Sequence, residues 1–156
     1  MEFNSTVVGV IILLIILIPV IMLISSSSGK NKKIKNSLIE LSKTQGINPQ
    51  DIDVIGNLVI GIDDASKKLV YSSQVNLTED LKIINLDDLK SCRTKSVRQS
   101  DQILDWVGLE LVEENGKREI PFYIETDETG LSRDPLVCLQ DAKRWEEKIT
   151  LLLKAS

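Results

Sequence analysis

The hydrophobic pattern of the chain begins with an apolar run near the N-terminus. Residues 7–24 contain 18 consecutive positions without a charged or strongly polar side chain. At about 1.5 Å per residue, a helix of this length spans roughly 27 Å, which is close to the thickness of a bilayer's hydrocarbon core. The run therefore predicts a transmembrane helix over 7–24, in which Pro19 is tolerated as a kink.

Four lysines follow this run directly and none precedes it: Lys30, Lys32, Lys33 and Lys35. Under the positive-inside rule, this asymmetry predicts that residues 1–6 form a short extracytoplasmic segment and that the rest of the chain is cytoplasmic. These juxtamembrane lysines can also attract anionic lipid headgroups. A cleaved signal peptide is the alternative interpretation, but it should begin with a basic segment, whereas residues 1–6 carry only Glu2.

The segment after the run predicts a linker and a short helix. Ser25–Gly29 is a stretch of small residues. Beyond it, Ile34, Leu38 and Leu41 recur at helical spacing and Gly46 supplies a stop signal. We interpret residues 25–54 as a basic linker with a short amphipathic helix and an irregular approach to the main domain.

From residue 55 onward, the hydrophobic period changes to two, which is typical of half-buried strands. Leu58, Ile60 and Ile62 share one face, and a polar turn follows them. Strands are predicted at residues 58–62, 68–73, 81–85 and 88–97.

A hairpin is predicted around Asn115-Gly116, a favoured two-residue turn. Pairing Glu114 with Lys117 places three apolar pairs on one face: Leu111 with Ile120, Leu109 with Phe122, and Val107 with Ile124. The same register brings Glu113 to Arg118. Pro121 lacks a backbone donor and therefore predicts an edge strand or a local irregularity.

The chain ends with a predicted amphipathic helix. Asp134-Pro135 is typical of an N-cap followed by a proline at the first helical position. The apolar positions then recur at spacings of three and four: Cys138, Ala142, Trp145, Ile149 and Leu152. Several strands and one final helix predict an α+β fold with an antiparallel sheet.

This order resembles a pleckstrin-homology-like domain over residues 55–154. The segments that carry the resemblance are Leu58–Asp63, Lys68–Tyr71, Ile84–Leu89, the Asn115-Gly116 hairpin and the helix containing Trp145. The resemblance implies a bent antiparallel sheet closed by the C-terminal helix, and a binding or scaffolding role. The whole chain is similar to uncharacterised bacterial single-pass membrane proteins with such a domain at residues 55–156, which implies the bacterial inner (cytoplasmic) membrane.

Lipid-binding members of that class cluster basic residues at the first hairpin loop. Here the loop opens with Asp63-Asp64 and offers only Lys67 and Lys68. This departure favours a protein partner over a phosphoinositide, and the resemblance assigns no binding residue.

The composition excludes several classes of functional site. The 156 residues include no histidine and two cysteines, and the formal net charge is −4. Histidine-based triads and metal sites are excluded, and an acidic chain is unlike a nucleic-acid-binding protein. Cys92 and Cys138 are interpreted as buried packing residues. We therefore expect no catalytic residue, no metal and no cofactor, and hence a protein that is not an enzyme.

One basic cluster lies within the acidic domain: Lys90, Arg93, Lys95 and Arg98. On an extended strand, Arg93 and Lys95 share a face and can meet an acidic partner or membrane phosphates. The sequence thus predicts a membrane-tethered, non-enzymatic interaction or scaffold protein that presents a small domain to a protein partner or membrane complex. The alternatives are a sensor of anionic lipid surfaces and, less favoured, an enzyme of unrecognised type.

Overall fold

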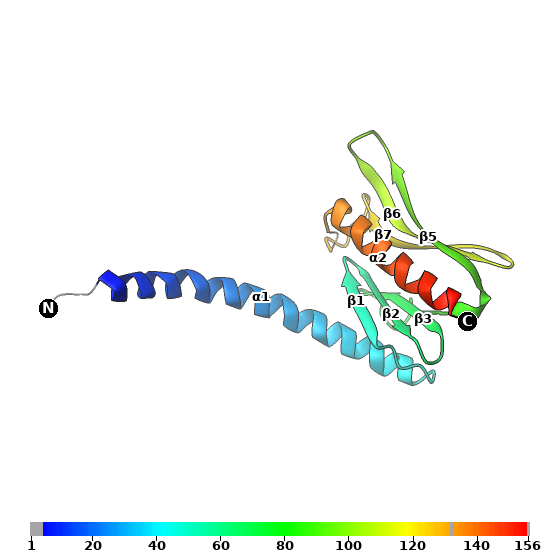
Figure 1. Ribbon diagram of the computed structural model, residues 1–156, viewed down its shortest axis with the longest axis horizontal. Helices are drawn as coiled ribbons and strands as arrows, with labels where there is room; N and C mark the ends of the chain where they lie inside the picture. Colours follow the sequence, from blue (N-terminus) through cyan, green and yellow to red (C-terminus); the bar gives the residue numbers. More distant parts are fainter. Residues whose placement is uncertain (1–4, 132, 156) are drawn as a thin grey trace. The chain divides into compact units, whose positions relative to one another are not determined.

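The structure is a computed structural model that describes the backbone of residues 5–131 and 133–155, and their side chains except those of residues 20–28. It divides into two compact units, residues 1–34 and 35–156. Figure 1 shows the elements in chain order: α1 (Ser5–Lys43), β1 (Asp51–Ile55), β2 (Leu58–Asp63), β3 (Lys68–Ser73), β4 (Lys82–Asn85), the 3-10 turn η1 (Leu86–Asp88), β5 (Leu89–Arg98), β6 (Leu104–Glu113), β7 (Gly116–Ile124) and α2 (Pro135–Lys154).

Helix α1 is continuous through the segment predicted to be a linker. Ser25–Gly29 lies inside the helix, so the interpretation of this stretch as a linker is wrong. The physical reason is that serine costs a helix only about 0.5 kcal/mol and a single glycine about 1 kcal/mol relative to alanine, which does not interrupt a long helix.

Among the described residues, no helix is both long enough and apolar enough to cross a membrane. The predicted span 7–24 extends into residues 20–24, whose side chains lie outside the described ones.

Strands β1 to β4 form an antiparallel sheet in sequential order, called sheet A. The strands predicted at 58–62, 68–73 and 81–85 correspond to β2, β3 and β4 within one residue at each end. The sequence missed β1, which occupies part of the predicted irregular segment. Its apolar residues Ile52 and Val54 alternate with two aspartates, and a hairpin turn with Gly56 at φ +58° joins it to β2.

Strands β5 to β7 form a second antiparallel sheet, called sheet B. The predicted hairpin is confirmed, but its register is wrong by two residues. Glu113 lies opposite Gly116, so the turn consists of residues 114–115, and Leu109 lies opposite Ile120. A shift of two leaves every side chain on its own face, so the hydrophobic pattern does not distinguish these two registers.

The two expectations for Pro121 are both confirmed. Strand β7 is at the edge of sheet B, and the ladder slips by one residue between Val107 and Gly108. Beyond the slip, Ile124 lies opposite Trp106 instead of Val107 and is 38% exposed. The predicted meeting of Glu113 with Arg118 is confirmed as an ion pair of 3.1 Å.

Helix α2 begins as predicted, because the Asp134 carboxylate accepts a hydrogen bond of 2.8 Å from the Leu136 amide. Its predicted apolar face is buried at four positions: Cys138, Ala142, Trp145 and Ile149. These residues join the inward faces of both sheets in one core. The α+β class, with antiparallel sheets and a C-terminal helix, is therefore confirmed.

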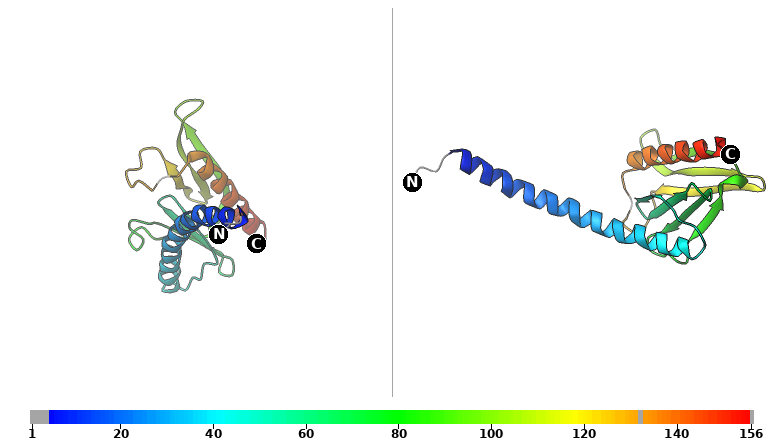
Figure 2. Two further views of the ribbon diagram at one scale, coloured as in Figure 1. Left: turned by 90° about the vertical axis from the view of Figure 1, so that its left-hand side faces the viewer. Right: turned by 60° about the horizontal axis from the view of Figure 1, so that its bottom comes forward.

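Hydrogen bonds connect side chains of α2 with an edge strand of each sheet. The Trp145 indole N–H donates to Asp53 on β1 over 2.8 Å, and Glu146 accepts from the Thr94 amide on β5 over 2.7 Å. Helix α2 thus packs on sheet B and reaches β1 of sheet A through polar side chains (Figures 1 and 2).

A second buried layer lies outside this core. Leu38 and Ile47 are at most 1% exposed, and Val59 and Val70 on sheet A are fully buried. The last turns of α1 lie alongside sheet A (Figures 1 and 2). The compact unit therefore begins at residue 35, within α1, and not at the predicted residue 55.

Candidate functional site

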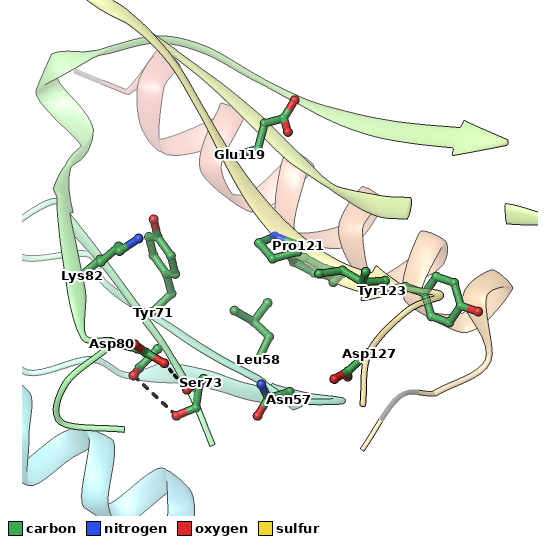
Figure 3. Close-up of a pocket in the computed structure, with 13 residues that line it drawn as sticks. Asn57, Leu58, Tyr71, Ser73, Asp80, Lys82, Glu119, Pro121, Tyr123 and Asp127 are labelled. Atoms are coloured by element: carbon green, nitrogen blue, oxygen red, sulfur yellow. Dashed lines mark hydrogen bonds between the residues drawn. The ribbon is translucent and has the colours of Figure 1, made fainter. Parts of the chain in front are cut away.

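A cavity of about 260 Å³ opens between sheet A and strand β7 (Figure 3). We call it the β7 cavity. Its lining comes from the β1–β2 turn and the start of β2, the end of β3, the β3–β4 connection and the start of β4, and from β7 and the loop that follows it. The lining residues are Asn57, Leu58, Tyr71, Ser72, Ser73, Asp80, Lys82, Glu119, Pro121, Phe122, Tyr123, Ile124 and Asp127. The cavity therefore combines residues that are far apart in the sequence.

Hydrogen bonds between two loops fix one wall of the cavity. The Gln74 amide donates to the Asn57 carbonyl over 2.7 Å, and the Gln74 side chain donates to the Gly56 carbonyl over 2.6 Å. The Ser72 hydroxyl donates to the Leu77 carbonyl over 2.7 Å. These contacts hold the β3–β4 connection against the β1–β2 turn, so the wall does not depend on a bound ligand.

The floor of the cavity is apolar and belongs to the core. Leu58 and Tyr71 are each 7% exposed, and Phe122 is 4% exposed. Figure 3 shows Leu58 and Tyr71 on the side of sheet A and Pro121 on the side of β7. Within the described part of the chain, nothing hydrogen-bonds to the Tyr71 hydroxyl. The hydroxyl oxygen is itself open to solvent, so the cavity presents it as an accessible hydrogen-bonding group.

The rim of the cavity is predominantly acidic. Three carboxylates, those of Asp80, Glu119 and Asp127, lie around it with one ammonium group, that of Lys82. Asp80 accepts a hydrogen bond from the Ser73 hydroxyl, and Glu119 pairs through its Oε1 atom with Lys95. The formal charge of the lining is therefore −2, or −1 when Lys95, the partner of Glu119, is included.

The predicted contact residues of β5 are only partly brought together. Arg93 and Lys95 share the outer face of sheet B, as predicted, since Arg93 lies opposite Glu110 and Lys95 opposite Gly108. Lys90 is an exposed residue near the start of the strand. Arg98, at the far end of the strand, donates to the Asp101 carbonyl over 3.0 Å.

Arg93 and Lys95 already form ion pairs with carboxylates. The Arg93 Nε atom donates to Glu110 over 2.7 Å, and Lys95 lies 3.7 Å from the other oxygen of Glu110. The hydrogen bond from Arg93 lowers the pKa of Glu110 below its usual range, against the opposing effect of burial, with help from the charges of Lys117 and Lys95. The positive charges of Arg93 and Lys95 on this face are therefore balanced by carboxylates of the same sheet.

The four lysines that follow the apolar run all lie on α1. Lys30, Lys32 and Lys33 are exposed, and Lys35, the first residue of the compact unit, is partly buried. The exposure of Lys30 and Lys32 leaves these two side chains accessible to a charged surface.

Neither cysteine is suited to act as a nucleophile. Burial raises the pKa of Cys92 to about 12, with a further contribution from the charge of Glu146. Burial, with the nearby charge of Asp141, also raises the pKa of Cys138. Since the thiolate is the reactive form, both thiols are unreactive at neutral pH. Among the described residues, no group of histidine, cysteine and acidic side chains could hold a metal ion.

The sequence did not identify the β7 cavity. Its residues are separated by up to 70 positions, from Asn57 to Asp127, and their convergence depends on how the two sheets pack. The one available signal was Pro121, which correctly marked β7 as an irregular edge strand. No family model, curated protein or solved structure matches this chain.

Proposed function

We propose that this protein is a membrane-tethered, non-enzymatic binding protein in which α1 anchors a small domain that recognises a protein partner. One observation carries the anchoring step. The large apolar residues from Val7 to Ile18 of α1 are all between 42% and 64% exposed. Covering such side chains gains about 1.5–3 kcal/mol each, so a surface of this kind requires an apolar environment. A bilayer supplies it on every side of a helix.

The four juxtamembrane lysines support an orientation for this anchor. They follow the apolar part of α1 and have no counterpart before it. Under the positive-inside rule, the N-terminus lies outside and the domain faces the cytoplasm. The resemblance to bacterial single-pass membrane proteins supports the inner membrane of a bacterium as the location.

The domain itself is proposed to be pleckstrin-homology-like. Two antiparallel sheets of four and three strands, followed by a C-terminal helix, support this proposal. Such a scaffold supports many binding functions, so the functional argument has to come from the site.

A protein partner is better supported than an anionic lipid surface. Arg93 and Lys95 are already paired with Glu110 and Glu119, and the lining of the β7 cavity is acidic. The lipid alternative depends on the exposed lysines of α1. Steeply salt-dependent binding to anionic vesicles, absent with neutral vesicles, would favour it.

Membrane fractionation of cells that express the full chain with a C-terminal tag tests the anchoring proposal. We expect the wild-type protein to remain in the membrane pellet after carbonate extraction. The double variant Leu13→Lys/Ile16→Lys should move to the supernatant, because a lysine at the centre of a membrane helix costs about 2.5–3.5 kcal/mol.

The matched control is Leu136→Lys, which places a charge on an apolar residue of α2 that is 60% exposed. This variant should stay in the pellet. Extraction of the wild-type protein by carbonate would overturn the proposal. A stoichiometric protein that crosslinks to the membrane-bound chain, and is lost when residues 35–156 are deleted, would support the partner step.

A further inference from the structure

We infer that the β7 cavity receives a lysine or arginine side chain from the partner protein. This inference rests on the proposed function, because it names the chemistry by which that partner is recognised. The size of the cavity, its lining and the edge strand beside it lead to this occupant.

The dimensions of the cavity suit one long side chain. Sites for drug-sized ligands are roughly 300–1,000 Å³, whereas the β7 cavity is about 260 Å³. Leu58, Pro121 and Phe122 provide apolar walls, which match the methylene stem of lysine or arginine. An apolar stem and a charged end are therefore both accommodated.

The polar groups of the cavity determine the sign of the occupant's charge. The carboxylates of Asp80, Glu119 and Asp127 outnumber two ammonium groups, that of Lys82 and that of Lys95, which pairs with Glu119. Residues 46–156 as a whole carry 21 acidic against 14 basic side chains, so the long-range field also attracts cations. An acidic or phosphorylated occupant would be repelled.

Tyr71 adds an unused acceptor and an aromatic ring. It is 7% exposed and lines the cavity, and within the described residues its hydroxyl has no partner. Its oxygen can accept a hydrogen bond from an ammonium or guanidinium group, and its ring can contribute a cation–π contact. Lys95 holds the Oε1 atom of Glu119, which leaves Oε2 for the same incoming group.

The edge strand argues for an inserted side chain and against strand addition. A peptide that adds to a sheet requires free backbone donors along the edge. Strand β7 is at the edge of sheet B, but Pro121 in its middle has no N–H and the ladder is irregular beside it. Recognition at this edge therefore depends on the cavity.

Titration of the isotope-labelled full chain in lipid nanodiscs, followed by NMR, tests the inference. The probes are four pentapeptides with alanine at the outer positions and lysine, arginine, norleucine or glutamate at the centre. We expect saturable shifts of the Leu58, Tyr71 and Phe122 amides with the lysine and arginine peptides. The norleucine peptide should bind about tenfold more weakly, and the glutamate peptide should not bind.

Two variants connect the binding to the cavity. Glu119→Gln removes one carboxylate and Tyr71→Phe removes the free hydroxyl, and each should weaken binding of the lysine peptide by about three- to tenfold. Asp64→Asn is the matched control, since it removes an exposed carboxylate of the β2–β3 turn. The amide spectrum shows whether each variant keeps the wild-type fold. If one of them does not fold, Asp80→Asn, which removes another carboxylate of the cavity, takes its place with the same expected loss of binding.

The inference is overturned by equal binding of the norleucine and lysine peptides, or by shifts confined to residues outside the cavity. It is also overturned if free butylamine binds as tightly as the lysine peptide, because the ligand would then be a small cation. If the peptides do not bind in the cavity but the chain stays anchored in the membrane and still crosslinks to its partner, the cavity inference is rejected and the proposed function stands.

Discussion

At the scale of single residues, Asp63 is the buried charge that joins two loops of the compact unit. Its side chain accepts backbone hydrogen bonds from Asn48 over 2.9 Å, from Ala65 over 3.0 Å and from Ser66 over 3.3 Å. Burial alone would raise the pKa of this carboxyl, but these hydrogen bonds outweigh burial and lower the pKa below its usual range. The ionised form therefore stabilises the fold.

Replacing Asp63 with asparagine should lower the free energy of unfolding by about 2 kcal/mol at pH 7, because the new amide group faces the Asn48 N–H. The difference between wild type and variant should depend on pH. The folded-state pKa is depressed, so the contribution of the carboxylate is complete above the unfolded-state pKa of about 3.9 and is lost as pH falls through the lower folded-state value. Urea unfolding followed by tryptophan fluorescence at several pH values measures both effects.

Asp64→Asn is the control for this prediction, since Asp64 is the exposed neighbour in the same turn. Its unfolding free energy should stay within about 0.5 kcal/mol of the wild type. An Asp63→Asn variant with wild-type stability at neutral pH would contradict the assigned role. The sequence predicted a polar turn here, but it could not tell which carboxylate is buried, because that depends on contact with Asn48 from another loop.

At the scale of elements, local signals predicted most of the strands and the final helix. Period-two hydrophobicity identified β2 and β3, and Asp134-Pro135 identified the start of α2. The predictions from sequence failed where an element depends on contacts with residues far away in the chain, or where the hydrophobic pattern fits two registers equally well. Strand β1 carries two aspartates, one of which binds Trp145 across 92 residues. The hairpin register was missed because a two-residue slip preserves the hydrophobic face.

Gly108 is required where β6 and β7 approach each other most closely. A Cβ atom at this position would overlap the Ile120 carbonyl oxygen and would lie 2.6 Å from Cη2 of Trp106. The Trp106 ring thus lies over the glycine, beside the point where the ladder slips. Gly108→Ala should therefore lower the unfolding free energy by about 2–3 kcal/mol through overpacking. It should also displace Trp106, which a red shift of the fluorescence would detect.

Gly61→Ala in β2 is a matched control for this prediction. The nearest atoms to its added Cβ are side-chain carbons of Ile52 and Pro49, both at 3.1 Å, which can yield slightly. This variant should lose less stability than Gly108→Ala and leave the Trp106 fluorescence unchanged. Equal losses in the two variants would contradict a specific close approach at Gly108.

At the scale of the whole molecule, the sequence predicted the α+β class but not the site. Two of the four basic residues it selected on β5, Arg93 and Lys95, pair with Glu110 on β6 and Glu119 on β7. The β7 cavity shares Glu119 with these ion pairs, but the rest of its lining depends on packing between the two sheets. A linear pattern identifies which residues share a face of one strand, but it does not specify which strand ends meet in space. The candidate site was therefore beyond local sequence reasoning.

The boundary of the compact unit leads to a prediction about truncated chains. Leu38 and Ser42 of α1 are fully buried, and Ile47 is 1% exposed, so the last turns of α1 complete the second buried layer on sheet A. A chain of residues 35–156 should unfold cooperatively, as measured by circular dichroism during heating. A chain of residues 47–156 should be less stable by at least about 2–5 kcal/mol, the range for losing one buried leucine side chain.

Point variants separate this packing effect from a general effect of truncation. In the 35–156 chain, Leu38→Ala should reproduce much of the loss, because it leaves a cavity against buried residues. Glu40→Ala changes an exposed residue of the same helical turn and should leave the midpoint of unfolding nearly unchanged. If residues 47–156 were as stable as residues 35–156, the end of α1 would be a connection outside the domain. If the predicted loss is found, α1 is one helix with an exposed apolar part and a buried end, and its last turns belong to the domain that it carries.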